Sequence, residues 1–430
     1  MSKENNVIGI IGLGYVGLPL AKSYLQSDVK VLGFDVDTNK VEALNKGKSS
    51  LDIFPDSFLR ESLQKKKFKA FSSFASIKKC DPVIICVPTP LDKFHQPDLS
   101  YVISSIKSAA KFLKKGALVS LESTTYPGTS IEIIKPLLES HDFVVGKDIH
   151  LCYSPEREDP GNHAYTLKNT PKVVSGFSQK CLSKAKEVYS IVCDTLVPVS
   201  SLEAAELCKL IENIQRSVNI GLMNELRLFA EKAGINLFEV IDAAATKPFG
   251  FTPYYPGPGV GGHCIPIDPF YLTFKAREFG VHTRFIELAG EVNESMPSYI
   301  IRRVGEVLNF QKKSFSNSKI LCIGLSYKKN VGDTRESPSV QIFHQLIELG
   351  AKTDYHDPLV PSFPSMRKYN INSNSVNLSK KTISKYDLII VNTLHDKIDV
   401  QALYKYSKKI IDSAGSLRHI KDKLNKIILV

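Results

Sequence analysis

Short apolar runs alternate with segments of helical length through the first two hundred residues of the chain. The runs that predict β-strands lie at residues 7–12, 29–35, 82–87, 117–121, 149–153 and 172–175. Each run is bounded by glycine, proline or polar residues, which end a strand. Strands that alternate with helices favour a parallel sheet covered by helices on both faces. We therefore expect an α/β domain over residues 1–200.

From about residue 201, apolar residues recur at steps of three and four, which is the spacing of one helix face. The pattern predicts a single amphipathic helix over residues 202–230, roughly 30 residues and about 45 Å long. We expect a helix of this length to bridge domains or to form a subunit interface. The segment 247–272 is rich in proline and glycine and predicts a structured loop, and a further helical stretch continues to about Phe310. The polar, serine-rich residues 313–317 mark the next boundary.

A second set of apolar runs then restarts the opening pattern. These runs lie at residues 319–327, 352–355, 387–392 and 409–412. The first of them reaches a glycine, Gly324, as the first run of the chain does. The repeat is structural rather than literal, because Ser326 and Lys328 stand where a phosphate-binding turn would have glycines. We expect a second, smaller Rossmann-like domain over residues 313–430 and a central helical and catalytic-loop region over 201–312. The predicted fold class is α/β, with two Rossmann-like parallel-sheet domains joined by a long central helix.

Composition and charge exclude several other classes. Apolar residues make up 43% and charged residues 23% of the chain, and no run of about 18 apolar residues is present, so we expect no membrane span. The net charge of +12 comes from scattered lysines and arginines, which favours a solvated surface over nucleic-acid binding. The apolar segment 7–21 contains several glycines, and only Lys3, offset by Glu4, precedes it. We interpret it as a strand and turn rather than a signal peptide.

The eight cysteines include no Cys-x-x-Cys pair. Most of their neighbours are apolar strand or helix residues, which argues against a zinc site and against a disulfide framework. We therefore expect no metal and a location in the reducing cytoplasm.

A glycine motif follows the first predicted strand and opens a helical segment. The spacing Gly12-x-Gly14-x-x-Gly17 permits a tight turn, the close approach of a pyrophosphate and close helix packing. The helix N-terminus then faces the phosphates. Asp35 ends the second predicted strand, where a carboxylate accepts the ribose hydroxyls of NAD and repels the 2′-phosphate of NADP. The pattern predicts an NAD site; a plain glycine turn in an α/β sheet is the alternative.

A second motif, Gly261-Gly262-His263-Cys264 followed by Asp268, places a cysteine in an open glycine-rich loop. A thiol beside an NAD site suggests aldehyde oxidation, in which the thiol adds to the carbonyl and loss of hydride gives a thioester. The alternative is a buried cysteine that serves only as a small apolar residue. Lys209 and Asn213 share one helix face at i and i+4 spacing. A helical lysine is usually a solvated surface charge, so a catalytic role for Lys209 depends on the presence of Cys264.

Together these motifs resemble those of the UDP-glucose/GDP-mannose dehydrogenase family, in family order and over nearly the whole chain. The matching segments are 12–19, 87–90, 122–129, 153–157, 209/213, 261–264 and 332–337. Within the family, residues 253–269 are most similar to the UDP-N-acetylglucosamine 6-dehydrogenases and less similar to the UDP-N-acetylmannosamine dehydrogenases. UDP-glucose dehydrogenases usually lack the histidine of this loop.

The resemblance implies a four-electron oxidation of a sugar C6 hydroxyl to a carboxylate. NAD would be the cofactor and a UDP-sugar the substrate, with UDP-N-acetylglucosamine favoured. Cys264 would be the nucleophile that holds the aldehyde as a thiohemiacetal and then as a thioester. Lys209, helped by Asn213, would stabilise the developing oxyanion.

The resemblance also assigns water activation, cofactor binding and substrate binding to particular residues. Glu156 and Asp268, with Thr124, would position and deprotonate water for thioester hydrolysis. The residues that would bind NAD are Gly12, Gly14, Tyr15, Val16, Gly17, Asp35, Lys40, Pro88, Thr89, Ser123, Thr124 and Arg335. The residues that would bind the substrate are Glu156, Arg157, Lys209, Asn213, Lys247, Tyr254, Tyr255, Gly257, Gly261 and Lys328. Among these, Lys328 would contact the nucleotide diphosphate and Lys247 would reach a substrate across a subunit interface.

Two positions depart from the family pattern. Pro160 falls near the place of a second carboxylate that UDP-glucose-specific members carry. Asp412 lacks the arginine that often follows it, for which Arg418 could compensate. We expect the loop 253–269 and the segment 156–163 to form the walls of the sugar pocket.

The apolar face of residues 202–230 and the resemblance together predict a homodimer or larger homo-oligomer. The product would serve the synthesis of a surface polysaccharide, such as a capsule or O-antigen. Two alternative functions are that of a two-electron NAD alcohol dehydrogenase and that of a non-catalytic nucleotide sensor. The complete set of Cys264, Lys209 and Glu156 argues against both. The sugar epimer, the pathway and the oligomer size stay open.

Overall fold

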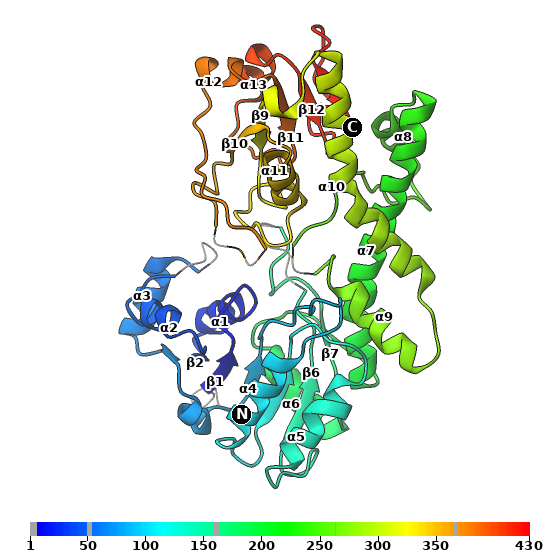
Figure 1. Ribbon diagram of the computed structural model, residues 1–430. Helices are drawn as coiled ribbons and strands as arrows, with labels where there is room; N and C mark the ends of the chain where they lie inside the picture. Colours follow the sequence, from blue (N-terminus) through cyan, green and yellow to red (C-terminus); the bar gives the residue numbers. More distant parts are fainter. Residues whose placement is uncertain (1–6, 50–53, 158–163, 263, 365, 367) are drawn as a thin grey trace. The chain divides into compact units, whose positions relative to one another are not determined.

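The computed structural model describes residues 7–49, 54–157, 164–262, 264–364, 366 and 368–430. These residues fall into two compact units. The first unit contains the chain up to Glu212 together with Phe270–Val281, and the second contains Asn213–Pro269 and His282–Val430. Figure 1 shows the chain coloured along its length. Neither unit is one continuous stretch of sequence.

A six-stranded parallel sheet forms the centre of the first unit. Its strands are β1 (Val7–Ile11), β2 (Lys30–Phe34), β3 (Phe68–Phe71), β4 (Val83–Ile85), β5 (Leu118–Leu121) and β6 (His150–Tyr153), in the order β3-β2-β1-β4-β5-β6. Ile8, Ile10 and Val31 have no exposed surface and belong to its core. This strand order is that of a doubly wound dinucleotide-binding sheet, whose order reverses between β1 and β4.

Helices lie between the strands of this sheet along the chain, and one more follows its last strand (Figure 1). They are α1 (Gly17–Gln26), α2 (Thr38–Asn45), α3 (Asp56–Gln64), α4 (Ser100–Ala110), α5 (Lys135–Glu139) and α6 (Gln179–Tyr189), with a 3₁₀ turn at Phe74–Lys79 and a π turn at Ser130–Ile134. Short polar side chains begin several of them: Asp37 accepts a backbone N–H of α2, and Ser178 accepts one of α6. Such caps satisfy donors that a helix leaves unpaired at its start.

The predicted strands of this unit are confirmed, with two differences. Strand β7 (Lys172–Val174) does not join the main sheet but pairs in parallel with β8 (Leu196–Pro198). The sequence pattern does not predict β3 or β8. Strand β3 is a short edge strand whose central Lys69 is exposed, so it lacks the apolar run that identified the central strands.

Long helices follow the first sheet. They are α7 (Leu202–Ala233), α8 (Leu237–Ala244), α9 (Asp268–Glu278) and α10 (Arg284–Phe310). The long helix predicted over 202–230 is confirmed as α7. The predicted loop 247–272 is wrong at its end, because α9 begins at Asp268. Pro269 lies in the first turn of α9, where a missing N–H costs nothing, so the prolines there mark a helix start rather than a continuing loop.

A five-stranded parallel sheet lies in the second unit, which makes the second Rossmann-like sheet a confirmed prediction. Its strands are β9 (Lys319–Ile323), β10 (Lys352–His356), β11 (Leu388–Val391), β12 (Ile410–Asp412) and β13 (Ile427–Leu429), in the order β10-β9-β11-β12-β13. Its helices are α11 (Pro338–Glu348), α12 (Lys380–Ser384) and α13 (Val400–Tyr406), and a 3₁₀ turn at Phe315–Asn317 precedes β9. Strand β13 is not predicted, because it is a three-residue edge strand at the end of the chain.

Among the described residues, none of the helices offers an apolar stretch of the length needed to cross a bilayer. In both sheets the strand order reverses beside the first strand, at β1/β4 and at β9/β11. Open α/β sheets bind ligands at the carboxyl ends of the strands near such a reversal. The residues that follow β1, β2, β4 and β5, and those that follow β9, β10 and β11, are therefore where each unit is expected to hold its ligand.

Candidate active site

The glycine motif forms the turn from β1 into α1. A Cβ at Gly17 would lie 1.9 Å from the carbonyl oxygen of Gly12, so helix and strand approach too closely for any other residue. A Cβ at Gly14 would meet nothing within 4 Å, which leaves room for a phosphate to reach the backbone. Val16 immediately precedes α1, and Tyr15 is 41% exposed. This geometry fits the phosphate-binding turn of a dinucleotide site.

The Asp35 carboxylate follows β2 and lies beside this turn. Its Oδ2 accepts the Leu13 N–H at 2.9 Å and the Lys40 ammonium at 2.9 Å, and its Oδ1 accepts the Asp37 N–H at 3.0 Å. The turn, Asp35 and Lys40 are thus brought together, as predicted for one cofactor site. A carboxylate has about four acceptor positions, so one remains for a ribose hydroxyl.

The loops after β4 and β5 carry the other predicted cofactor residues of the first unit. Thr89 is buried, Pro88 is exposed and Thr124 is half-buried. The Ser123 hydroxyl donates to the Val87 carbonyl oxygen at 2.7 Å and so joins the two loops. Both loops lie on the carboxyl side of the sheet, where the strand order reverses.

A buried ion pair that the sequence analysis missed supports the loop after β5. The Lys172 ammonium lies 3.1 Å from Glu122 Oε2 and donates to the Pro155 carbonyl oxygen at 3.2 Å, and both charged side chains are 2% exposed. Burial alone would lower the pKa of Lys172, but Glu122, together with Cys193 and Glu156, raises that pKa above its usual value. The pair is therefore ionised, and it fixes the residue that precedes Glu156. A lysine within a predicted apolar strand was the signal for it.

Lys209 on α7 is buried rather than solvated. Its ammonium donates to the backbone oxygen of Glu156 at 2.6 Å and lies 3.3 Å from Glu156 Oε2, and its side chain is 7% exposed. The structure thus brings these two predicted catalytic residues together. Arg157 donates to the Pro171 carbonyl oxygen at 2.6 Å and also forms an ion pair with Glu212, so it is held by the protein itself.

Glu206, about one turn before Lys209 on α7, is a second buried carboxylate that the sequence analysis missed. Its two oxygens accept the N–H groups of Gly128 at 2.6 Å and Ser130 at 2.9 Å. Burial raises the pKa of Glu206 from 4.5 to about 7, although the hydrogen bonds from Ser130 and Gly128 oppose this rise. A raised folded-state pKa stabilises the fold below the ordinary value, and this stabilisation is lost as the pH rises through about 7.

In the second unit, Asn213 and Asp268 form a buried pair. Asn213 Nδ2 donates to Asp268 Oδ2 at 2.6 Å, and Asp268 has no exposed surface. The Asp268 N–H donates to the Cys264 carbonyl oxygen at 2.8 Å, which places the cysteine at the turn that begins α9. Cys264 is half-buried and forms no disulfide.

The other seven cysteines lie where a thiolate is disfavoured or inaccessible. All except Cys208 are buried. Burial raises the pKa of the Cys80 and Cys152 thiols to about 12 each. Burial and the neighbouring Glu212 also raise the pKa of Cys208. Because the thiolate is the nucleophile, Cys264 is the best-placed cysteine for covalent chemistry.

The loop before Cys264 is anchored by its aromatic residues. The Tyr254 hydroxyl donates to a glutamine of α7 at 2.7 Å, and the Tyr255 hydroxyl donates to Asp242 at 2.6 Å. Arg418 lies 4.7 Å from the centre of the Tyr255 ring and 3.3 Å from Asp242, so it supports this loop although it does not follow Asp412 directly. Lys247 is exposed.

The glycines of this loop pack against the segment after β9. The Gly257 carbonyl oxygen accepts a hydrogen bond from Arg227 at 3.0 Å. A Cβ at Gly261 would lie 2.6 Å from the Tyr327 side chain, so a larger residue there would displace one of the two segments. The cysteine loop and the loop after β9 are therefore fitted to each other.

The loop after β9 carries the remaining predicted residues. The Arg335 carbonyl oxygen accepts the Gly262 N–H at 3.0 Å, and the Arg335 guanidinium pairs with Asp333 at 2.6 Å. Lys328 is half-buried on the same loop. Two buried residues that the sequence analysis missed, Asp357 and His395, hold this loop. An aspartate close to the end of a predicted strand, as at Asp35, was the signal for the first.

Some predictions lie beyond what these contacts test. His263 and residues 158–163, including Pro160, lie outside the described residues. The grouping of Glu156, Asp268 and Thr124 around one water stays a prediction. Within the described part of the chain, no three His, Cys, Asp or Glu side chains are grouped as metal ligands would be.

Comparison with known proteins identifies three consecutive matches along the chain. The model of the UDP-glucose/GDP-mannose dehydrogenase family, NAD binding domain, matches residues 6–193. The models of the central domain and the UDP binding domain of the same family match residues 203–295 and 321–419. The phosphate-binding turn lies in the first of these segments, Cys264 in the second and Lys328 in the third.

Individual relatives agree with these matches. A UDP-N-acetyl-D-glucosamine 6-dehydrogenase of Pseudomonas aeruginosa is 33% identical and covers 91% of this chain and 90% of its own. A UDP-N-acetyl-D-mannosamine dehydrogenase of Escherichia coli K12 is 36% identical over 78% of this chain and 81% of its own. The solved structure of a UDP-D-ManNAc dehydrogenase from Pyrococcus horikoshii is 31% identical, with a TM-score of 0.85 and 95% coverage of both chains. The chain belongs to the UDP-glucose/GDP-mannose dehydrogenase family and is an NAD-binding oxidoreductase of that family.

Proposed function

We propose that the protein catalyses the NAD-dependent, four-electron oxidation of the C6 hydroxyl of a UDP-N-acetylhexosamine, with UDP-N-acetylglucosamine as the favoured substrate. The observation that carries this proposal is the loop from Gly261 to Asp268. It places a half-buried thiol outside any disulfide at the start of α9, four residues before a buried aspartate held by Asn213. A two-electron dehydrogenase has no need of this thiol.

The residues of the first unit fit NAD. The open space above Gly14 and the carboxylate of Asp35 match the two recognition elements of a dinucleotide, its pyrophosphate and its ribose hydroxyls. Bound NAD would accept one hydride in each of the two oxidation steps. We assign Tyr15, Val16 and Lys40 to the same site, together with the loops after β4 and β5. Arg335, a residue of the second unit, is assigned to NAD from the family resemblance alone.

Cys264 supplies the covalent step. The alcohol is first oxidised to the aldehyde, with loss of a hydride and a proton. The thiol sulfur then bonds to the aldehyde carbon, giving a thiohemiacetal, and loss of the second hydride gives a thioester. Water breaks the carbon–sulfur bond, which releases the carboxylate and restores the thiol. Two NADH are formed for each sugar.

The charged and amide side chains stabilise and guide these steps. The Lys209 ammonium, helped by the Asn213 amide, stabilises oxygen as negative charge develops on it. Glu156 and Asp268, with Thr124, position the water and accept its proton. Lys209 is held near Glu156 in the protein alone, so a bound substrate would share this ammonium with a carboxylate.

The sugar and the nucleotide are assigned to the two loops of the second unit that are fitted to each other. Tyr254, Tyr255, Gly257 and Gly261 form a wall of the sugar pocket. Lys328 contacts the diphosphate, because a mobile ammonium is a good partner for a phosphate. Arg157 and Lys247 complete the proposed substrate contacts, Lys247 from a second subunit.

The substrate is tested by counting NADH released with four UDP-sugars. A pocket built for an N-acetyl group contains polar groups that pair with its amide. When UDP-glucose binds instead, these polar groups stay unpaired, which costs roughly 1–3 kcal/mol for each. We expect two NADH per sugar and a kcat/KM at least about tenfold higher for UDP-N-acetylglucosamine than for UDP-glucose.

Each other outcome of this assay has its own meaning. UDP-N-acetylmannosamine is the second candidate, since relatives named as its dehydrogenases cover most of this chain. If the enzyme prefers it, only the assigned sugar epimer changes and the proposed mechanism stands. UDP-N-acetylgalactosamine is expected to react more weakly. A preference for UDP-glucose would refute the substrate assignment, and one NADH per sugar with free aldehyde would refute the covalent mechanism.

Cofactor choice follows from Asp35. We expect the enzyme to prefer NAD over NADP by more than tenfold, about 1.4 kcal/mol or more, because the carboxylate repels the 2′-phosphate. Asp35→Ser should narrow this ratio in steady-state kinetics. Asp37→Ser, which removes a neighbouring carboxylate charge but keeps a hydroxyl that can cap α2, is the matched control and should leave the ratio unchanged. Equal use of both cofactors by the unmodified enzyme would contradict the assignment.

Assembly into a homodimer or larger oligomer is also proposed. Leu222, Leu226 and Phe229 follow one another on α7 at steps of four and three, and they are 48%, 39% and 65% exposed. Such a row on one helix face is typical of a covered interface. We expect Leu226→Glu with Phe229→Glu to lower the mass measured by light scattering to that of a monomer. Leu424→Glu, at an exposed leucine elsewhere, is the control. A monomeric unmodified protein would refute the proposal.

The biological setting is proposed from the same relationship. A uronic acid linked to UDP is a building block for surface polysaccharides such as a capsule or O-antigen. Nucleotide sugars are cytoplasmic metabolites, and eight cysteines without a disulfide fit that compartment. The division into functional domains at residues 200 and 312 stays a prediction.

A further inference from the structure

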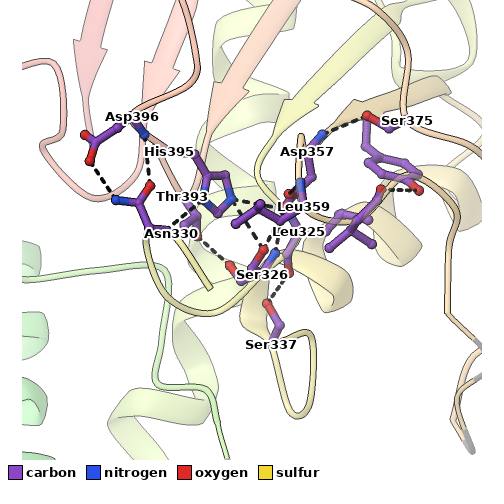
Figure 2. Close-up of polar contacts among 12 residues, drawn as sticks. Leu325, Ser326, Asn330, Ser337, Asp357, Leu359, Ser375, Thr393, His395 and Asp396 are labelled. Carbon is purple, nitrogen blue, oxygen red and sulfur yellow. Dashed lines mark hydrogen bonds and ion pairs between the residues drawn. The ribbon is translucent and has the colours of Figure 1, made fainter. Parts of the chain in front are cut away.

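Three buried polar residues follow three neighbouring strands of the second sheet. Ser326 follows β9, Asp357 follows β10 and His395 follows β11, and their exposed fractions are 0%, 0% and 1%. The strand order of this sheet reverses between β9 and β11. Figure 2 shows the three side chains turned toward one another. They form a cluster, which we call the Asp357 cluster, at the position where such a sheet would bind a ligand.

The Asp357 carboxylate is the centre of this cluster. Its Oδ2 accepts the Leu325 N–H at 2.9 Å, the Ser326 N–H at 3.0 Å and the Ser326 hydroxyl at 2.7 Å. Its Oδ1 accepts the Leu359 N–H at 2.9 Å. Burial alone would raise the pKa of Asp357, but the hydrogen bonds from His395 and Ser326 hold it well below its usual range. The aspartate is therefore a fixed anion that binds the start of the loop after β9.

His395 binds the same loop further along. Its Nδ1 accepts the Asn330 N–H at 2.9 Å, so the proton of the neutral ring lies on Nε2. Nε2 lies 3.2 Å from Asp357 Oδ2 and can donate to it. The His395 imidazole thus links the Asp357 carboxylate to the Asn330 N–H, which donates to the ring and not to the carboxylate.

Contacts from the end of β11 complete the support of the loop (Figure 2). The Thr393 hydroxyl donates to the Ser326 carbonyl oxygen at 2.6 Å, and the Asn330 side chain donates to Asp396 at 2.6 Å. Lys328 lies between the two supported residues Ser326 and Asn330. Its backbone is therefore held at fixed points on both sides.

The equivalent residue of the first sheet is used differently. Like Asp357, Asp35 accepts the N–H that follows a glycine at the end of the first strand and the N–H of the second residue after itself. Its remaining partner is the Lys40 side chain, and it is 9% exposed. Asp357 is instead enclosed by Ser326 and His395. The equivalent carboxylate of the second sheet thus binds a loop instead of a lysine side chain.

We infer that His395 and Asp357 are positioning residues that fix the loop carrying Lys328 for contact with the diphosphate of the sugar nucleotide. This inference rests on the proposed function, which assigns Lys328 to that diphosphate. A cluster that only stabilised the domain would not act on nucleotide affinity through Lys328.

The test is a double-mutant cycle on the affinity of the full-length protein for UDP, measured by calorimetry. We expect Lys328→Ala and His395→Leu each to weaken UDP binding by about tenfold or more. The double variant should bind UDP no more weakly than Lys328→Ala alone, within about twofold, because misplacing an absent ammonium costs nothing. In kinetics, His395→Leu should raise the KM for the sugar nucleotide more than the KM for NAD, because Arg335, the residue of this loop assigned to NAD, lies beyond the supported stretch 326–330.

A second pair of variants keeps the test decisive if His395→Leu does not fold. Ser326→Ala removes one hydroxyl bond to Asp357, and His395→Gln retains one donor and one acceptor, so both should show smaller losses of UDP affinity. Tyr386→Phe is the control, because it removes a partly buried hydroxyl bond to Asp354 in the same domain without touching the loop. It should leave UDP affinity unchanged.

The outcomes separate this inference from the proposed function. If the loss of UDP affinity in the double variant equals the product of the two single losses, the positioning role is refuted, while the assignment of Lys328 stands. Unchanged UDP affinity in Lys328→Ala would instead show that Lys328 does not contact the diphosphate. The inference that His395 and Asp357 position it would then be refuted as well. Equal losses of UDP affinity in Tyr386→Phe and His395→Leu would mean a structural role only.

Discussion

Cys264→Ala is expected to abolish formation of the carboxylate product, with kcat for acid formation falling by at least about a thousandfold. Without the thiol, the aldehyde cannot become the thioester from which the second hydride is lost. Cys264→Ser is expected to retain a weaker nucleophile and to accumulate an ester, which intact-protein mass spectrometry would detect. The measurement is NADH release together with identification of the product.

Cys208→Ser is the matched control for this prediction. Cys208 is the other cysteine that is not fully buried, but burial and Glu212 raise its pKa. We expect this variant to oxidise the sugar at close to the rate of the unmodified enzyme. Acid formation by Cys264→Ala at the unmodified rate would show that the chain does not use this thiol.

Lys172→Met is expected to destabilise the first unit by about 3–5 kcal/mol, the cost of leaving a buried charge unpaired. Both members of the Glu122–Lys172 pair are 2% exposed, so solvent cannot replace the lost ammonium around the carboxylate. The variant also loses the hydrogen bond to the Pro155 carbonyl oxygen, which precedes Glu156. The measurement is the midpoint of the first unfolding transition in urea.

Two variants decide whether burial is the cause. Lys65→Met removes an exposed lysine from its pair with Glu61 and should leave the urea midpoint close to that of the unmodified protein, because solvent screens this pair. Lys172→Met combined with Glu122→Leu should recover much of the lost stability, because both charges are then absent. If the single Lys172 variant unfolds at the same urea concentration as the unmodified protein, the buried pair does not stabilise this unit.

The sequence predicted those parts of the fold and site that depend on local pattern. The period of the apolar residues in 202–230 is enough to define α7, and the glycine spacing with Asp35 is enough to place the phosphate-binding turn. Cys264 stood out because a thiol in a glycine-rich loop differs from one on an apolar strand. Edge strands such as β3 and β13 were missed, since one partner strand and partial exposure leave them without a continuous apolar run.

Contacts between distant residues could not be predicted in the same way. Lys172 and Glu122 are 50 positions apart, and His395 and Asp357 are 38 apart. Periodicity indicates which face of an element is buried but not which polar group it meets there. Lys172 was visible as a lysine in an apolar strand, but its partner became known only from the packing of β5, β6 and β7.

The discontinuity of the two units constrains how the chain can be synthesised and divided. The first unit includes Phe270–Val281, from which Lys275 pairs with Glu132 at 2.7 Å and Tyr271 donates to the Pro90 carbonyl oxygen at 3.2 Å. A fragment that stops at Glu212 lacks these partners. On the ribosome, the first unit can be completed only after residue 281 has emerged, when residues 213–269 of the second unit have already been made. Synthesis of the second unit therefore begins before the first unit can finish folding.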